Sequence, residues 1–243
     1  MSEFFNKMKL VFQDTVLRKR ILFTLGALVI FRVLAAIPIA GVDHGRLAQF
    51  FSSNQIFGLL NIFSGGGLSQ LSIVMLGVGP YITGSIIMQL LTIMSPKLKE
   101  MYQEEGEAGR RKFAQYGRLL TIPLAVLQAF SFIKILESQQ ILAHLSGFTL
   151  ITDILVITAG SVLLMWIGEL ISEYGIGNGV SLIIFAGIVA ELPATLGQAF
   201  FSFDPSQIPI YLAFIVFAAL VIVGVVIITE AERPIPVTYA KQV

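Results

Sequence analysis

The chain has 243 residues, of which 56% are hydrophobic and only 13% are charged, and its net charge is +1. A soluble domain carries roughly twice that share of charged residues, so the composition indicates a membrane protein. The near-neutral balance gives no sign of a nucleic-acid partner. The absence of cysteine excludes disulfides, thiolate catalysis and cysteine-ligated metals.

Six apolar segments follow one another along the chain. The first twenty residues carry charges of both signs without a signal-peptide pattern, so we expect a cytoplasmic N-terminal segment of the mature protein. A membrane-spanning helix needs about 20 mostly apolar residues, and no barrel-like alternation is present. We therefore expect six helical spans, at residues 21–40, 73–94, 119–136, 150–166, 180–196 and 208–228.

The stretch between the first two spans is neither a span nor an ordinary loop. It includes FFSSNQIFGLLNIFSGGG, residues 50–67, which is too apolar for a loop and too interrupted for a span. Irregular backbone inside a membrane is tolerated where protein or water surrounds it. A re-entrant, half-inserted segment fits this stretch best.

The second expected span contains three glycines and Pro80, and it places Val78 and Ile82 four residues apart on one helix face. This pattern is typical of a tilted helix that packs closely through small residues, and the residues alone favour that interpretation. The alternative is a helix thinned on one side, whose short aliphatic side chains surround a pore. Apolar rings of this kind close pores by dewetting.

The fifth expected span repeats the pattern, with Val180 and Ile184 one turn apart behind the glycine-rich sequence GIGNG. A buried stripe at helical spacing is the plain interpretation. If these residues instead share a ring with Val78 and Ile82, the GIGNG loop must dip below the membrane surface. Such backbone is tolerated only beside a water-filled cavity, so the ring hypothesis requires a wet funnel on the cytoplasmic side.

Chemistry-bearing residues are scarce in the expected spans. No nucleophile–base pair is visible, which sets an intramembrane hydrolase aside. An ion-coupled transporter needs an ionisable group at mid-depth, and the candidate is Arg32, to which we assign a structural role. Half of an inverted-repeat secondary transporter remains the alternative from another class, because it shares glycine-interrupted helices and a re-entrant segment.

The basic residues predict the orientation of the chain. Thirteen lysines and arginines fall on one side, in the N-terminal tail, the loop after the second span and the C-terminal tail, so both termini are expected in the cytoplasm. Residues 95–118 are interpreted as a solvated charged loop, which is also suited to dock an acidic or RNA-bearing partner. Residues 230–243 are interpreted as a loop cut in the middle, which predicts a fragment or one piece of a split protein.

Five blocks of the sequence carry a resemblance to a known family: FRVLAAIPIAGVD, NIFSGGGLSQLSIVMLGVGPYITGSIIMQLL, EGEAGRRKFAQYGR, GELISEYGIGNGVSLIIFAGIVAELP and ERPIPVTYAKQV. The chain resembles the SecY/Sec61-alpha family over nearly all its residues, and the second and fourth blocks are highly specific. The resemblance implies an all-α membrane protein, a polytopic helical bundle of six transmembrane helices plus a re-entrant plug helix. It would form the first half of an inverted-repeat ten-helix channel and one further helix.

The resemblance also implies a domain order and a function without enzymatic activity. Residues 21–206 would form the first five-helix half with the plug at 61–72, residues 207–229 the sixth transmembrane helix, and residues 230–243 part of a cytoplasmic loop. The channel would pass unfolded polypeptides across the bacterial plasma membrane and release apolar helices sideways into the lipid bilayer. Its implied partners are the SecE and SecG subunits, the SecA ATPase or the ribosome, signal peptides and nascent polypeptide, and the missing C-terminal half.

The resemblance assigns residues to four roles. The pore ring consists of Val78, Ile82, Val180 and Ile184. The plug comprises Asn61, Ile62, Phe63, Ser64, Gly65, Gly66, Gly67 and Leu68. The lateral gate includes Thr83, Ile86, Ile87 and Gln89. Cytosolic partners would dock at Arg110, Arg111, Lys112, Arg233 and Lys241. No cofactor or metal is implied.

Overall fold

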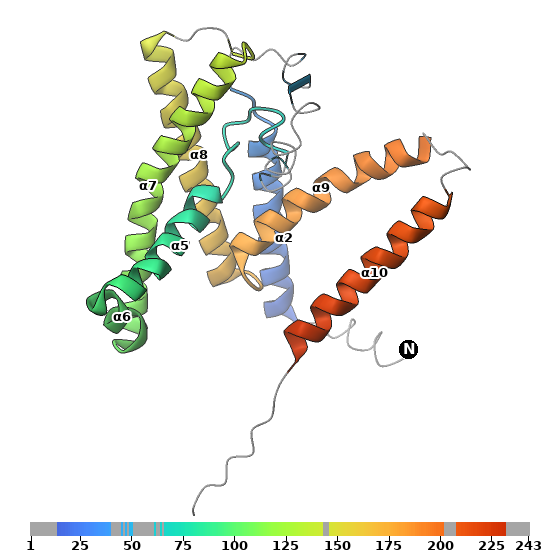
Figure 1. Ribbon diagram of the computed structural model, residues 1–243. Helices are drawn as coiled ribbons and strands as arrows, with labels where there is room; N and C mark the ends of the chain where they lie inside the picture. The colour runs from blue at the N-terminus through green and yellow to red at the C-terminus, as the bar shows by residue number, and fades with distance from the viewer. Residues whose placement is uncertain are drawn as a thin grey trace, which may run out of the picture. The chain divides into compact units, whose positions relative to one another are not determined.

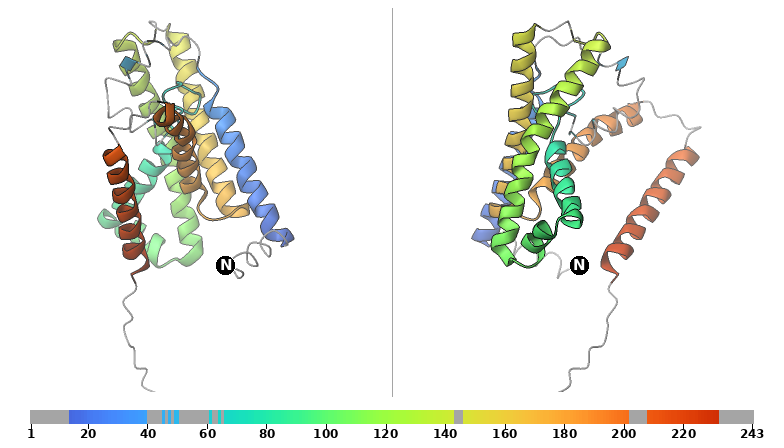
Figure 2. Two further views of the ribbon diagram at one scale, coloured as in Figure 1. Left: turned by 90° about the vertical axis from the view of Figure 1, so that its right-hand side faces the viewer. Right: turned by 60° about the vertical axis from the view of Figure 1, so that its left-hand side comes forward.

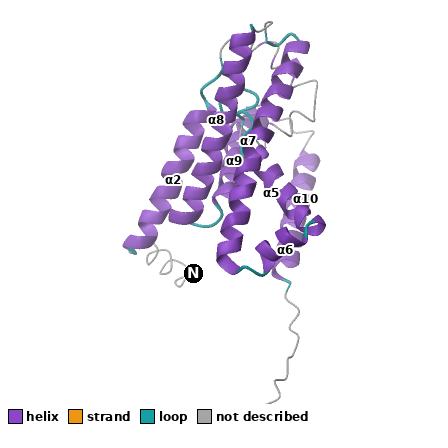
Figure 3. Ribbon diagram, turned by 90° about the vertical axis from the view of Figure 1, so that its left-hand side faces the viewer, coloured by secondary structure: helices purple, strands orange, loops and turns teal. Residues whose placement is uncertain are grey.

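The computed structural model describes residues 14–39, 45, 47, 49–50, 61, 64, 66–142, 146–201 and 208–231. Within these ranges the chain is mainly helices joined by turns (Figure 3), and Pro38 forms an isolated bridge with Ser72. The predicted all-α class is confirmed. The expected plug residues Ile62, Phe63 and Gly65 and the docking residues Arg233 and Lys241 lie outside the described residues.

The chain divides into two compact units, Met1–Pro193 and Ala194–Val243. The first unit contains helices α2 (Thr15–Ala35), α5 (Gly79–Met94), α6 (Pro96–Gln103), α7 (Gly106–Ser138), α8 (Gly147–Tyr174) and most of α9 (Gly179–Phe201). Here α7 and α8 run side by side, α2 packs on α8, and α5 lies against α7 (Figures 1 and 2). The second unit contains the end of α9 and helix α10 (Ile208–Glu230).

Among the described residues, four helices are long and apolar enough to cross a membrane, namely α7, α8, α9 and α10. The helix α10 is the most apolar of them, with a mean hydropathy of 3.1, and none of its residues is buried within the chain. The helix α2 is not among them, since it begins in the basic residues Arg18, Lys19 and Arg20. Helix α5, with 16 residues, is apolar but shorter than a full span.

The second expected span, residues 73–94, is wrong in its first part, because residues 73–78 form turns and the helix begins at Gly79. Two left-handed residues, Leu71 (φ 44°) and Gly77 (φ 58°), prevent an earlier helix start. Pro80 lies in the first turn of α5, where its missing N–H leaves no intrahelical bond unmade. Pro80 therefore starts a helix and does not thin one.

Gly160 of α8 explains how the turn at residues 73–78 comes close to the bundle. A Cβ atom at this position would collide with the backbone oxygen of Ile73 and would crowd the Val74 side chain. Only glycine permits this approach of a helix to a turn. The turn itself is buried at Val74 and Met75, so it belongs to the core and not to a surface loop.

The prediction of a charged loop at residues 95–118 is also wrong, because these residues form α6 and the first part of α7. The two helices pack tightly: the rings of Tyr102 and Phe113 lie 4.8 Å apart, and a Cβ atom at Gly109 would collide with the backbone oxygen of Met101. The small and apolar residues Met101, Gly109 and Phe113 form the inner face of a helical hairpin, whereas the charged residues lie outside. Helix α7 then continues unbroken through Pro123.

The segment after α2 and the segment before α5 pair with each other. The N–H of Ile39 donates to the oxygen of Leu71 at 2.8 Å, and the N–H of Ile73 donates to that of Ile37 at 3.0 Å. Leu71 is completely buried in a core cluster with Ile133. The C-terminal base of the expected plug, near residue 71, is therefore fixed in the core.

Replacing Ser161 with alanine is expected to loosen the turn before α5. The Ser161 hydroxyl, which is buried in α8, donates a 2.7 Å hydrogen bond to the oxygen of Gly77. Losing the donor leaves a buried carbonyl unpaired, which costs about 1–3 kcal/mol. The measurement is thermal unfolding of the purified full-length protein. The control is Ser138→Ala, at an exposed helix end where the hydroxyl donates to Ile135; equal melting of the two variants would contradict this role.

Candidate functional site

The structure brings the four expected pore-ring residues into one cluster. Val78 caps the start of α5 and is only 3% exposed, and Ile82 lies in the first turn of that helix. Val180 and Ile184 lie in the first turns of α9 and pack with them against buried residues of α2 and α8. More than 95 residues separate the Val78–Ile82 pair from the Val180–Ile184 pair in sequence. The two pairs therefore meet because of the tertiary fold.

The start of α9 is held against α8 through two glycines. A Cβ atom at Gly179 would collide with the oxygen of Gly168, and one at Gly168 would lie 3.0 Å from Val180 Cγ2. The Gly179 N–H donates to the Ser172 hydroxyl at 2.8 Å, and the Asn178 side chain accepts from the N–H of Ser181 at 3.1 Å. These contacts fix where Val180 and Ile184 project.

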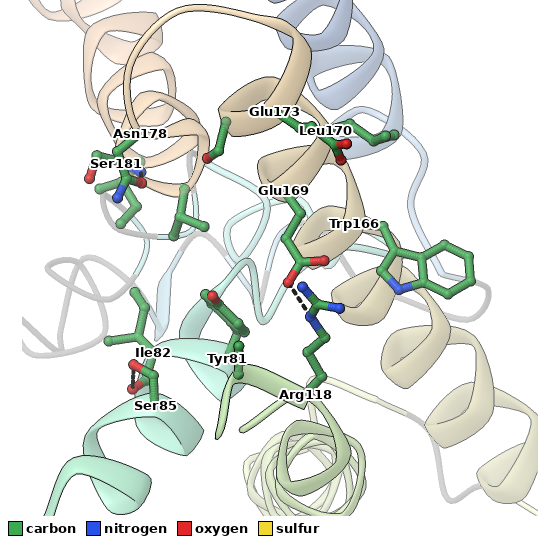
Figure 4. A pocket seen from close by; sticks show the side chains of 14 residues that line it. Tyr81, Ile82, Ser85, Arg118, Trp166, Glu169, Leu170, Glu173, Asn178 and Ser181 are labelled. Atoms are coloured by element: carbon green, nitrogen blue, oxygen red, sulfur yellow. Dashed lines mark hydrogen bonds and ion pairs between the residues drawn. The ribbon is translucent and has the colours of Figure 1, made fainter. Parts of the chain in front are cut away.

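A polar cavity of about 850 Å³ lies on one side of the cluster (Figure 4). Its walls come from α5, α7, α8 and the start of α9, and the charged residues among them are Arg118, Glu169 and Glu173. Arg118 reaches from α7 to Glu169 of α8, with 2.5 Å between Nε and Oε1. The loop residue Asn178 also lines this cavity. The cavity is consistent with the wet funnel that the ring hypothesis requires.

A second, mostly apolar cavity of about 660 Å³ lies on the other side. It is lined by α5 and α7 together with Ser64 and Leu68, which belong to the expected plug. Ile82 and Ile184 line both cavities, whereas Val180 lines the polar one and Val78 the apolar one. The four aliphatic residues therefore lie at the boundary between the two hollows.

The described part of the expected plug consists of one helical residue, Asn61, followed by turns. Ser64 and residues 66–71 form turns and not the short helix that was expected, and Gly66 has a left-handed backbone (φ 78°). The turns are closed by side chains: the Ser64 hydroxyl donates to the oxygen of Asn61 and accepts from the N–H of Leu68, each at 3.0 Å. Side-chain hydrogen bonds of Ser64 and Asn61 thus take the place of the backbone hydrogen bonds that a helix would make here.

The expected lateral-gate residues do not form one buried group. Thr83 lines the apolar cavity, with its hydroxyl donating to the oxygen of Gly79, and Ile87 is half-buried. Ile86 and Gln89 lie on the exposed side of α5. The described docking residues Arg110, Arg111 and Lys112 are all exposed in the first turns of α7, on the helical hairpin.

Two polar pairs in the structure were not predicted from the sequence. Glu169 pairs with Arg118, and Glu191 accepts a hydrogen bond from Asn61. Arg32, the ionisable residue that was predicted to matter for structure, lies on the exposed side of α2. The sequence does offer a sign of Glu191, because this residue falls inside the expected span at residues 180–196, where ionisable side chains are rare and usually have a function.

Breaking the Arg118–Glu169 pair is expected to change stability only slightly. Both side chains are partly exposed, at 43% and 27%, so water screens their attraction. Arg118→Ala and Glu169→Ala should each lower stability by up to about 1 kcal/mol, and the double variant should cost less than their sum. Thermal unfolding of the three variants checks this coupling; strictly additive losses would show that the pair contributes nothing.

Comparison with known families gives a direct match. The family model described as SecY matches residues 72–243. The protein translocase subunit SecY of Mycobacterium tuberculosis is 44% identical over 240 residues, which cover 93% of this chain and 54% of the relative. The SecY subunit of Corynebacterium glutamicum is 41% identical over 244 residues, with 95% and 54% covered.

Two solved structures share the fold. The Sec61 channel of the canine ribosome–channel complex from the endoplasmic reticulum aligns with a TM-score of 0.64 at 22% identity, over 92% of this chain and 50% of that one. A protein-conducting channel aligns with a TM-score of 0.61 at 22% identity, over 86% and 48%. The chain spans about half the length of the relatives it matches.

Proposed function

Because the chain belongs to the SecY family, we propose that it supplies the first half, and one further helix, of a protein-conducting channel. Residues 21–206 are the five-helix half, residues 207–229 the sixth transmembrane helix, and residues 230–243 part of a cytoplasmic loop. The channel translocates unfolded polypeptides and inserts helices laterally into the membrane. The chain itself performs no chemical step.

The observation that carries this proposal is the position of Ile82 and Ile184 between two cavities. With Val78 and Val180 they form one side of a pore ring at the narrow waist of the channel. Aliphatic side chains exclude water when the waist is empty, and they offer no hydrogen bond or charge to a passing side chain. Any polypeptide sequence can therefore slide past them, whereas a charged ring would bind some sequences and repel others.

Residues 61–72 are proposed as the plug that closes the apolar cavity. This role is supported by Ser64 and Leu68, which line that cavity next to the ring. The lateral gate runs along α5 at Thr83, Ile86, Ile87 and Gln89. The exposed side of α5 supports this assignment, because a lip of the gate must face either a partner helix or lipid.

The remaining half of the channel, SecE and SecG are the proposed membrane partners. The need for these partners follows from exposed apolar side chains within the first unit, such as Ile93 and Met94 of α5 and Phe148 of α8. The helical hairpin with Arg110, Arg111 and Lys112, together with Arg233 and Lys241, docks the SecA ATPase or the ribosome from the cytoplasm. Both ends of the chain lie on that side of the bacterial plasma membrane.

The transporter alternative is not supported. The relatives named above are translocase subunits and channels, and none is a secondary transporter. The charged residues of the polar cavity also pair with each other in part, through Arg118 and Glu169, so they offer little to a charged solute.

The test of the proposed function uses the full-length protein that contains this chain, reconstituted in vesicles with its partner subunits and motor. A signal-bearing unfolded polypeptide is expected to become protected from added protease, and one without a signal is not. Deleting residues 61–70 should weaken that discrimination, because the plug no longer closes the waist. Failure of the intact protein to protect the signal-bearing polypeptide would refute the channel assignment.

A further inference from the structure

Glu191 connects α9 to the turn segment at residues 61–72. The Nδ2 atom of Asn61 donates a hydrogen bond of 3.0 Å to Glu191 Oε1, across 130 residues of sequence. Both side chains are partly buried. An ionisable residue in an apolar span calls for a specific role, and this contact is one polar interaction that Glu191 makes.

The two ends of the turn segment are held differently. Its base is fixed by the buried Leu71 and by backbone hydrogen bonds to Ile37 and Ile39. Its tip, which begins at Asn61, meets α9 through the Glu191 carboxylate. Leu68 belongs to the same core cluster as Leu71, so the contact with Glu191 acts on the Asn61 end of the segment.

Asn61 makes the tip respond as a unit. While Nδ2 donates to Glu191, its Oδ1 atom accepts from the N–H of Ser69 at 2.7 Å, and its backbone oxygen accepts from the N–H of Gly66 at 3.0 Å. One residue therefore both closes the turns and connects them to α9. Releasing Asn61 from Glu191 leaves its hydrogen bonds with Ser69 and Gly66 in place.

Gly66 lies close to the same carboxylate. A Cβ atom at this position would lie only 3.2 Å from Glu191 Oε1. The backbone there has φ +78°, which residues other than glycine rarely adopt. A larger residue at position 66 would therefore crowd Glu191 and disturb its contact with Asn61.

We propose that Glu191 is the latch of the plug: its hydrogen bond with Asn61 holds the tip of the turn segment on α9 and sets how readily the channel opens. The proposal rests on the channel function proposed above and names a specificity-determining residue for it. The latch is strong enough to bias the plug toward the closed position, because a charged acceptor makes a stronger hydrogen bond than a neutral one. It is weak enough to be displaced, because the carboxylate and the amide are both hydrated once they separate.

A charge-exchange series in the full-length protein tests this latch. Asn61→Asp keeps the acceptor for Ser69 but places a second carboxylate opposite Glu191, so the two repel each other. Adding Glu191→Gln to that variant supplies an amide that donates to the new carboxylate and restores the contact. Gln139→Glu is the control, since it adds the same charge to an exposed position outside the plug, at the end of α7.

The readout is the export of a reporter with a defective signal peptide, relative to one with an intact signal. Asn61→Asp is expected to raise export of the defective reporter about tenfold, as loss of one hydrogen bond with a charged group allows. The double variant should return to within about twofold of the original protein, and Gln139→Glu should export as the original protein does. Equal export by Asn61→Asp and the original protein, or a double variant as permissive as Asn61→Asp, would overturn the latch.

Two further measurements, on Glu191→Ala and on the intact reporter, ensure that every outcome either supports or rejects the latch. If Asn61→Asp does not accumulate in the membrane, Glu191→Ala removes the acceptor without adding charge and is expected to be permissive; unchanged discrimination would reject the latch. The intact reporter separates the latch from the channel assignment. If the original protein exports the intact reporter but the Asn61 and Glu191 variants export the defective reporter no better than the original protein does, only the latch is rejected. If the original protein does not export the intact reporter, the channel function itself is rejected.

Discussion

Ile82→Asp and Ile184→Asp, each introduced into the full-length protein, are expected to make the resting channel conduct ions and to slow polypeptide export. Both side chains line the two cavities, so a carboxylate at either position stands where the hollows meet. An aliphatic waist stays closed because water is not stable in it, and a charged group brings water back. Resting conductance should rise by roughly an order of magnitude or more.

Planar-bilayer recordings and a protease-protection export assay measure the two effects on the same preparation. Ile82→Val and Ile184→Val are the matched controls, since they keep the waist aliphatic and should conduct as little as the original protein. If the aspartate variants show the conductance and export of these controls, Ile82 and Ile184 do not form the seal.

Gly160→Ala is expected to be among the most damaging single-methyl changes in the bundle. The new Cβ atom collides with the backbone oxygen of Ile73, which cannot move aside as a flexible side chain would. Forcing one extra methyl into a packed core costs about 1–3 kcal/mol, and a backbone collision lies at the upper end of that range. The turn at residues 73–78 must shift, and the start of α5 with Val78 and Ile82 shifts with it.

Thermal unfolding of the full-length protein and its level in membranes measure this loss. The matched control is Gly26→Ala in α2, where a Cβ atom would have nothing within 4 Å. That substitution should leave stability unchanged or raise it slightly, because alanine favours a helix over glycine. If Gly160→Ala unfolds at the same temperature as Gly26→Ala, the bundle does not depend on the close approach of α8 to the turn at residues 73–78.

The later spans could be predicted from the sequence because one local property decides them. The last expected span, residues 208–228, becomes α10 (Ile208–Glu230), and the fourth, residues 150–166, lies inside α8 (Gly147–Tyr174). A long apolar stretch has few alternatives to a helix in a membrane. The helix ends extend beyond the apolar windows, since hydropathy does not mark where hydrogen bonding stops.

The start of α5 shows what hydropathy cannot decide. Residues 73–78 are as apolar as the helix that follows, yet they form turns because Leu71 and Gly77 adopt left-handed conformations and Gly160 of a distant helix leaves room for the turn. Residues 95–118 show the opposite error. Their charge suggested a loop, whereas the packing of Tyr102 on Phe113 makes a helical hairpin.

The candidate site was predicted in part. The aliphatic residues of the proposed ring were named through a family resemblance, because their spacing alone favours an ordinary packed stripe. The two cavities and the Asn61–Glu191 contact could not be predicted from the sequence, since each is formed by residues far apart in the chain. A carboxylate inside an apolar span was the one local sign of that contact.

Site-specific crosslinking to an arrested polypeptide tests the proposed waist most directly. Single cysteines replace Ile82, Ile184 or, as the control, Leu155, which lies on the exposed side of α8. A translocating chain stalled in the full-length channel should crosslink at positions 82 and 184 and not at position 155. Crosslinks at position 155 with none at 82 and 184 would contradict the account.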